Sequence, residues 1–173
     1  MNNPNTVSFI IPSINRETFK RTIDSIEARP GDEIIVEFDI PPTHRWGNDQ
    51  RNKGIARATG DYLAFMDDDD YYAPGHREIM ENAMNENPWK PNLFKMKYPD
   101  GRILWSKKEV VPGNIGSSMI FIPNIKECFF PWKDGRNMAD FIFVNTWRWL
   151  KEDIVWREEV ISLLGHNDEK LII

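Results

Sequence analysis

The chain has 173 residues, of which 40% are hydrophobic and 28% are charged, a balance typical of one soluble domain with its own core. The net charge of −5 at pH 7 argues against nucleic acid as the main partner, because binding phosphate requires a basic face. The single cysteine, Cys128, excludes an internal disulfide, so we expect a reducing compartment, the cytoplasm.

Targeting and membrane segments are not expected. No apolar stretch approaches the roughly 18 residues of a spanning helix, so we expect no transmembrane segment. The first residues, MNNPNTVSFIIPS, lack the basic and long apolar regions of a signal peptide. Cys128 is interpreted as a small buried hydrophobe, and His44 and His76 as surface residues.

The first forty residues have the pattern of a β-α-β unit. Residues 7–11 (VSFII) form a β-branched and aromatic run, which predicts a strand buried on both faces and closed by Pro12. Apolar residues recur at helical spacing over residues 17–28, and residues 33–39 (EIIVEFD) predict a second strand. This order is how a parallel α/β sheet begins.

The next segment leads into an acidic cluster. Residues 49–59 predict a helix with Asn48 or Asp49 as its N-cap and Gly60 after its end. Residues 62–66 (YLAFM) predict a buried strand, and four aspartates, Asp67 to Asp70, follow it directly. Ligands bind at the carboxyl ends of strands in open α/β sheets, and adjacent carboxylates need a cation or hydrogen-bond donors nearby. The alternative is a solvated acidic turn that caps the following helix.

The second half of the chain predicts shorter elements, including a β-hairpin in which Phe94, Met96 and Tyr98 share one face. Residues 129–132 (FFPW) are interpreted as an exposed aromatic loop. The predicted elements are a helix over residues 74–85, hairpin strands over 93–98 and 102–106, a strand over 117–122, a helix over 137–151 with Asn137 as N-cap, and one or two strands within 154–164.

Four segments, VSFIIPSINR, EIIVEFD, RNKGIARATGDYLAFMDDDDYY and MADF, resemble in this order the inverting family-2 glycosyltransferases of GT-A fold, over residues 6–150. The resemblance implies an α/β fold: a single Rossmann-like GT-A domain over residues 1–173, with a mostly parallel central sheet flanked by helices and a small antiparallel hairpin region in the second half. It also implies a nucleotide-binding half, residues 6–72, and an acceptor-side half, residues 90–165.

The activity implied by this resemblance is metal-dependent sugar transfer. The donor would be a nucleotide sugar, with a UDP-sugar expected, and the acceptor a hydroxyl group of a glycan, a lipid or another molecule. Mn²⁺ or Mg²⁺ would neutralise the charge of the departing diphosphate, and oxygen ligands favour these ions. Asp69 would hold the metal ion and His166 would complete its site, although a solvated tail histidine is the alternative.

The resemblance also assigns the donor pocket. Asp67 would reach the ribose or the metal shell, with Asp68 and Asp70 in support. Pro12 and Ser13 would meet the nucleobase or ribose through their backbone, and Asp39 would accept a hydrogen bond from a uracil or thymine N–H. In place of the family's Asp-Asp-Gly-Ser, this chain has Phe38-Asp39-Ile40-Pro41.

Two arginines and one further aspartate complete the candidate site. Arg16 and Arg51 are candidates for phosphate or base contacts, because a guanidinium binds phosphate in a bidentate way; surface ion pairs are the alternative. Asp140 would be the general base that takes the proton of the attacking hydroxyl, with a pKa depressed by its helix N-terminus. Ala139 stands where the family has an acidic residue, and a simple charge at the helix start is the alternative for Asp140. Residues 113–118 and Trp132 would face the acceptor, with core packing as the alternative for Trp132.

Two other functions remain open at this point. The departures at Phe38 and Ala139 allow a non-catalytic nucleotide-binding module with a degenerate transferase fold. A nucleotidyltransferase ranks last, because it would need a glycine-rich phosphate loop after the first strand, where this chain has Ser-Ile-Asn-Arg. The chain leaves little room for an acceptor domain after residue 150, so we expect the acceptor to be held by a partner, by a second copy in a homo-oligomer, or by an open groove.

Overall fold

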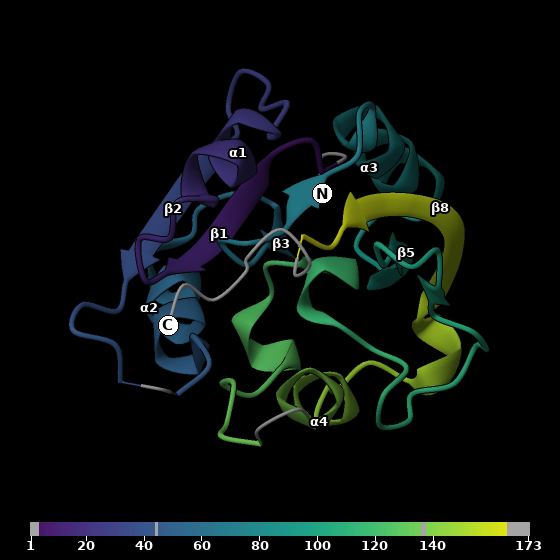
Figure 1. Ribbon diagram of the computed structural model, residues 1–173. Helices are drawn as coiled ribbons and strands as arrows, with labels where there is room; N and C mark the ends of the chain where they lie inside the picture. The colour runs from purple at the N-terminus through teal and green to yellow at the C-terminus, as the bar shows by residue number, and fades with distance from the viewer. Residues whose placement is uncertain (1–3, 44, 136–137, 166–173) are drawn as a thin grey trace.

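The fold is a central sheet with helices on both faces, seen in a computed structural model that describes residues 4–43, 45–135 and 138–165 (Figure 1). Helices α1 (Phe19–Asp24) and α3 (His76–Glu86) cover one face. Helices α2 (Asn48–Arg57) and α4 (Ala139–Asn145) cover the other. The predicted α/β class is confirmed.

Among the described residues the sheet has eight strands, in the order β2-β1-β3-β7-β5-β8-β4, with β6 paired to β5. The strands are β1 (Val7–Ser13), β2 (Glu33–Phe38), β3 (Tyr62–Phe65), β4 (Tyr71–Tyr72), β5 (Asn92–Lys97), β6 (Ile103–Leu104), β7 (Ile120–Pro123) and β8 (Val155–Leu163). Short 3-10 turns cover Ser117–Met119, Lys126–Cys128 and Lys151–Asp153.

The sheet is mixed, whereas the sequence predicted a mostly parallel one. Strands β2, β1 and β3 are parallel to one another, as the β-α-β pattern predicted. Strand β7 runs antiparallel to both of its neighbours, β3 and β5. Strand β8 is parallel to β5, and β4, which the sequence did not predict, is antiparallel to β8. The parallel part therefore carries the carboxyl ends of β1 and β3 to one edge.

Successive side chains along β1 and β3 point to opposite faces of the sheet, so each face carries a hydrophobic core. Phe9 and Ile11 point to the α1 and α3 side, and Ile10 to the α2 and α4 side. In β3, Ala64 packs on the first side and Phe65 on the second, as the period of two in a strand requires. Both strands are buried along their whole length, which matches their predominantly apolar sequence.

Several element bounds differ from the prediction for local reasons. Strand β1 continues through Pro12 to Ser13 by pairing with β2. Proline has no N–H, but this leaves no hydrogen bond of the sheet unmade, because β3 stops pairing with β1 at Ile10. Helix α4 ends at Asn145, where the Thr146 hydroxyl donates to the Phe143 carbonyl oxygen at 2.7 Å. The N-cap of α2 is Gly47, and Asn48 is its first helical residue. The predicted N-cap Asn137 lies outside the described residues.

Other expectations about burial were wrong. His76 is fully buried and stacks on Tyr72, with ring centroids 4.3 Å apart. Phe94 packs on the α3 side and Met96 on the opposite side, because the pairing of β5 with β8 shifts register between them. Cys128 is half-buried, and His44 lies outside the described residues.

Helix α2 packs tightly on the sheet. A Cβ atom added at Gly54 would lie 2.5 Å from Cγ2 of Ile10, so only glycine allows this close approach. Asn52 donates to the Trp132 carbonyl oxygen at 2.9 Å and accepts from the Trp132 N–H at 2.8 Å. Asn52 and Gly54 therefore have structural roles in the packing of α2. Among the described residues, no helix has the length and apolar character that crossing a membrane requires.

Candidate functional site

Two adjoining cavities lie beside the four aspartates Asp67 to Asp70. The larger one, of about 350 Å³, opens at the carboxyl ends of β1, β2 and β3. It brings together seven of the predicted site residues. They are Pro12, Ser13, Arg16, Asp39, Asp67, Asp68 and Asp69. Its other lining residues are Ile14, Pro42, Trp46 and Gly47.

The four aspartates Asp67 to Asp70 form a turn, called here the aspartate turn. Helix α1 and its N-cap residue fix the backbone of this turn, and a residue just after β8 fixes one of its carboxylates. Thr18 and Thr22 donate their hydroxyls to the carbonyl oxygens of Asp68, at 2.8 Å, and of Asp70, at 2.6 Å. From the other side, the Gly165 N–H donates to the Asp70 carboxylate at 3.0 Å. Three of the four aspartate residues are largely buried, and Asp67 alone keeps about a third of its side chain in solvent. The carboxylates are thus held in place before any ligand arrives.

Each carboxylate in the cavity has its own donors. Asp68 accepts from the Ser13 hydroxyl at 2.8 Å and from the Ile14 N–H at 3.0 Å, which ties the aspartate turn to the end of β1. The half-exposed Arg16 guanidinium pairs with Asp69 and lies 3.3 Å from Asp68. These hydrogen bonds and ion pairs offset the electrostatic repulsion among four adjacent carboxylates.

Arg51 is a buried part of this site, and the alternative of a surface ion pair is wrong for it. Only 3% of its side chain is exposed, and its guanidinium pairs with Asp67. The same group donates to the Trp46 carbonyl oxygen at 2.7 Å and lies over the Trp132 ring, 4.8 Å from its centroid. Arg51 therefore connects α2, the loop before it and the aspartate turn.

Asp39 directly follows β2 and lies at the wall of the cavity. It is 6% exposed, and one of its carboxylate oxygens accepts from both the N–H and the hydroxyl of Thr43, each at 2.9 Å. A carboxylate fixed in this way can accept a hydrogen bond from a ring N–H in the cavity. Phe38, next to it, is exposed and packs against Phe19.

A smaller cavity of about 200 Å³ adjoins the first and contains Asp140. It is lined by Asp67, Asp70, Met96, Tyr98, Leu104, Gly113, Ile115, Gly116, Ser117, Ser118, Asp140 and Leu164. Asp67 lines both cavities, so the aspartate turn stands between them. The predicted segment of residues 113–118 contributes all of its residues except Asn114 to this cavity.

The electrostatics of Asp140 differ from the expectation. Desolvation by the surrounding protein atoms raises the pKa of Asp140 to about 6, and the charge of Asp67 adds to this effect. The Arg51 charge and a hydrogen bond from the Ser117 N–H act in the opposite direction. Desolvation is therefore the largest influence on the pKa of Asp140, whereas the sequence predicted a pKa depressed by the start of the short helix α4. Ser117 also donates its hydroxyl to Asp67 at 3.4 Å.

The donor set of the aspartate turn fits a hard divalent cation. Carboxylate oxygens suit Mg²⁺ or Mn²⁺, and Mg²⁺ is commonly held by one or two protein carboxylates together with substrate phosphates. Within residues 4–43, 45–135 and 138–165, no group of three or more His, Cys, Asp or Glu side chains is placed to hold a metal ion. Asp67 and Asp69 line the same cavity. The proposed ligand His166 lies outside the described residues.

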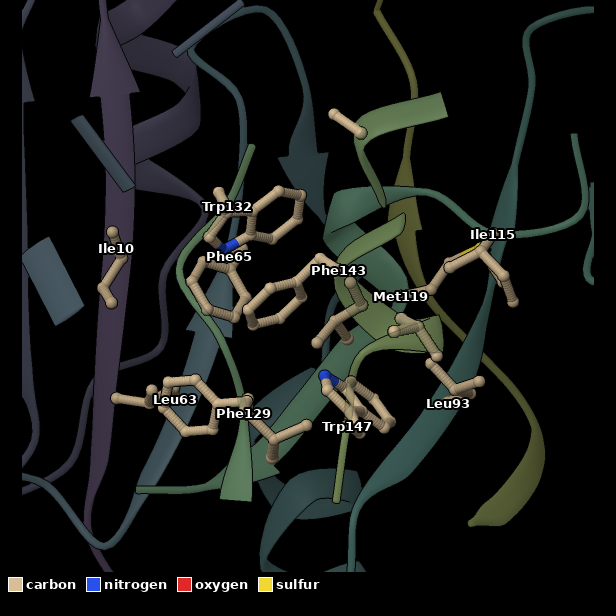
Figure 2. Close-up of a cluster of buried hydrophobic side chains, with 14 of the residues drawn as sticks. Ile10, Leu63, Phe65, Leu93, Ile115, Met119, Phe129, Trp132, Phe143 and Trp147 are labelled. Atoms are coloured by element: carbon tan, nitrogen blue, oxygen red, sulfur yellow. The ribbon is translucent and has the colours of Figure 1, made fainter. Parts of the chain in front are cut away.

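Trp132 belongs to the core. It is 3% exposed and stacks on Phe143, with ring centroids 4.2 Å apart and ring planes 10° apart (Figure 2). Figure 2 shows its indole beside Phe65 and Phe143, among the side chains of this hydrophobic cluster. Of the three aromatic side chains in the predicted loop, only that of Phe130 is exposed, so the alternative of core packing is correct for Trp132.

Trp46 and Tyr98 are cavity residues for which the sequence assigned no site role. Trp46 lines the larger cavity and Tyr98 the smaller one. The only sequence signal for Trp46 is an aromatic residue next to a glycine in a loop that follows the second strand. Neither residue has a spacing that marks it as functional.

Comparisons with solved structures show the fold. The crystal structure of TarS from S. aureus superposes with a TM-score of 0.70 at 14% identity, over 92% of this chain and 36% of TarS. The fragment TarS 1-349 superposes with a TM-score of 0.68 at 17% identity, over 92% of this chain and 60% of the fragment. The same fragment in complex with UDP-GlcNAc superposes with a TM-score of 0.60 at 14% identity, over 91% of this chain and 58% of the fragment. The chain thus spans between 36% and 60% of the length of these structures.

Sequence comparison adds the family. No curated protein sequence matches the chain significantly. The family model described as glycosyl transferase family 2 matches residues 40–129, which contain α2, β3 and the whole aspartate turn. This match covers more than half of the chain, and the fold agrees with it. The chain therefore belongs to glycosyl transferase family 2, in a GT-A fold.

Proposed function

We propose that this chain is an inverting glycosyltransferase that moves a sugar from a nucleotide sugar, a UDP-sugar first among the candidates, to a hydroxyl acceptor. The observation that carries the proposal is the position of Asp67, which lines both the larger cavity and the smaller cavity with Asp140. A donor in the first cavity and an acceptor hydroxyl in the second would meet at the aspartate turn. Family membership supports this function, as does the similarity to TarS, which has been solved with UDP-GlcNAc and with UDP.

In this proposal the larger cavity binds the nucleotide. Asp39 would accept a hydrogen bond from a ring N–H of the base, and the backbone of Pro12 and Ser13 would contact the base or ribose. Arg16, beside Asp68 and Asp69, would face the diphosphate. Residues 6–72 would then form the nucleotide-binding half and residues 90–165 the acceptor-side half.

Asp69, with Asp67 beside it, would hold Mn²⁺ or Mg²⁺, and His166 is proposed as a further ligand. A cation bound there would neutralise the charge that develops on the departing diphosphate. The chain's own contribution is to hold the carboxylates of the turn through α1 and Arg16, so that little reorganisation is needed.

Asp140 is the proposed general base. Its carboxylate would take the proton of the acceptor hydroxyl while that oxygen forms a bond to the anomeric carbon. The bond from this carbon to the diphosphate oxygen breaks in the same step, and the configuration inverts. A pKa of about 6 leaves Asp140 mostly ionised at pH 7 and makes it a stronger base than an ordinary aspartate.

The acceptor is proposed only as a class, a hydroxyl group of a glycan, a lipid or another molecule. A partner or a second copy of the chain would hold it where the smaller cavity opens. A cytoplasmic location is also part of the proposal, supported by the single free cysteine, Cys128.

The metal assignment leads to a test on Asp69. We expect Asp69→Asn to abolish the thermal stabilisation that UDP with Mn²⁺ gives the parent, because the amide removes the anionic metal ligand. Thermal shift is measured with Mn²⁺ alone, with UDP alone and with both. Asp100→Asn, an exposed aspartate in the turn between β5 and β6, is the matched control and should respond like the parent. An Asp69→Asn variant that keeps the full Mn²⁺-dependent shift would contradict the assignment.

A further inference from the structure

Trp46 is an exposed indole at the mouth of the larger cavity. About 64% of the residue is accessible to solvent, and it lines the cavity together with Pro12, Pro42 and Gly47. Large aromatic side chains gain stability from burial, so an indole left open at a cavity contributes little to the folded chain by itself. A flat apolar ligand in that cavity would cover it.

The backbone presents Trp46 in an uncommon conformation. Its φ of 56° lies in the left-handed region, which residues other than glycine, asparagine and aspartate rarely adopt, and Gly47 follows with a φ of 70°. A Cβ atom on Gly47 would lie 2.7 Å from Cβ of Pro12, so this loop packs directly on the end of β1. The conformation thus brings Trp46 to the same strand end that carries the candidate donor site.

Arg51 holds this loop from inside the protein. Its guanidinium donates to the Trp46 carbonyl oxygen at 2.7 Å and pairs with Asp67. Because Arg51 is 3% exposed, the Trp46 backbone is anchored to the aspartate turn through a buried group. The Trp46 backbone and the carboxylates of the turn are therefore held together at the edge of one cavity.

We propose that Trp46 stacks on the nucleobase of the nucleotide donor. This inference rests on the proposed function and adds a binding residue to it. The cavity has an apolar side, formed by Pro12, Pro42 and Trp46, and an acidic side, formed by the aspartate turn. A nucleoside diphosphate that coordinates a cation fits both sides, because its base has a flat π-face and its phosphates are the partners of the metal.

Stacking and edge recognition have separate consequences in this arrangement. Every base has a π-face, so an aromatic platform adds affinity without selecting among bases. Selection would come from Asp39 at the base edge. Loss of the Trp46 ring should therefore reduce the affinity for all nucleotides by a similar factor and leave the order of their affinities unchanged.

Calorimetry with UDP and Mn²⁺ on two variants tests the role of the ring. Trp46→Gly removes the ring and relaxes the left-handed backbone, whereas Trp46→Phe keeps an aromatic face. We expect the Kd for UDP to rise about 5- to 100-fold in Trp46→Gly and to stay within about threefold of the parent in Trp46→Phe. Inorganic diphosphate with Mn²⁺, which has no base, should bind both variants as it binds the parent. Leu150→Ala, an exposed apolar residue outside both cavities, is the control for loss of apolar surface.

The outcomes are distinguishable. A Trp46→Gly variant that binds UDP like the parent, or a Trp46→Phe variant as weak as Trp46→Gly, would overturn the stacking role. An equal rise in the Kd for UDP and for inorganic diphosphate would also overturn it, because such a result would show that the substitution changes the shape of the loop. If the parent itself binds no nucleoside diphosphate, the proposed function fails first. Tryptophan emission gives a second readout: its quenching by UDP should vanish in Trp46→Phe while calorimetry still detects binding.

Discussion

Asp140→Asn is expected to lower the rate of sugar transfer by about 10²- to 10⁴-fold, the usual contribution of a positioned general base. An amide has the shape of the carboxylate but cannot take the acceptor proton. Binding of UDP with Mn²⁺ should stay within about twofold of the parent, because Asp140 lines the smaller cavity only. The measurements are UDP release from a UDP-sugar with its acceptor and UDP calorimetry on the same preparations.

Stability and pH distinguish a base from a structural residue at this position. Burial raises the pKa of Asp140 to about 6, above its value in the unfolded chain, so the ionised form destabilises the fold at pH 7. The asparagine variant should therefore have a melting temperature at pH 7.5 no lower than the parent. In the parent, kcat/KM should rise with unit slope below about pH 6 and level off above it, with about one tenth of Asp140 ionised at pH 5 and nine tenths at pH 7. Transfer that is unchanged in Asp140→Asn would favour a non-catalytic nucleotide-binding module.

Arg51→Met is expected to reduce the free energy of unfolding by about 2–4 kcal/mol. The substitution leaves Asp67 without its ion-pair partner and the Trp46 carbonyl oxygen without its donor. The loss should fall below that of a fully buried pair, because about a third of the Asp67 side chain reaches water. Urea unfolding at pH 7.5 measures it.

The matched control is Arg57→Met, on the same helix. The Arg57 side chain, which pairs with Glu37, is 66% exposed, and pairs screened by water contribute little, so this variant should stay within about 0.5 kcal/mol of the parent. Because the Arg51 charge lowers the pKa of Asp140, Arg51→Met should also move the acid limb of the pH–rate profile to higher pH. Equal stability of the two methionine variants would show that the buried guanidinium does not hold this site together.

The fold was predictable from sequence where a single local pattern decides the structure. Predominantly apolar runs identified β1 and β3, and the parallel pairing of β1 with β2 followed from the short β-α-β spacing. The position of β7 was not predictable, because an antiparallel partner for β3 comes from residues more than fifty positions away. The opposite burial of Phe94 and Met96 depends on a register shift against β8, which no pattern within β5 reveals.

The candidate site was predictable to a similar extent. The aspartates and Asp39 follow strands whose ends must meet, so seven of the candidates line one cavity. The roles of Arg51 and Trp132 depend on packing between α2 and a segment about eighty residues later, so sequence spacing could not assign them. The raised pKa of Asp140 has the same origin, since burial by other elements decides it.

Calorimetric titration of the parent chain with UDP, GDP, CDP and TDP, each with Mn²⁺, with Mg²⁺ and without metal, tests the central claim most directly. The claim is that the cavity at the aspartate turn is a metal-dependent site for the donor nucleotide. We predict saturable binding of at least one of these nucleotides with Mn²⁺, UDP first, and much weaker binding when the metal is removed. Absence of binding by all four nucleotides in the presence of Mn²⁺ and of Mg²⁺ would contradict the claim.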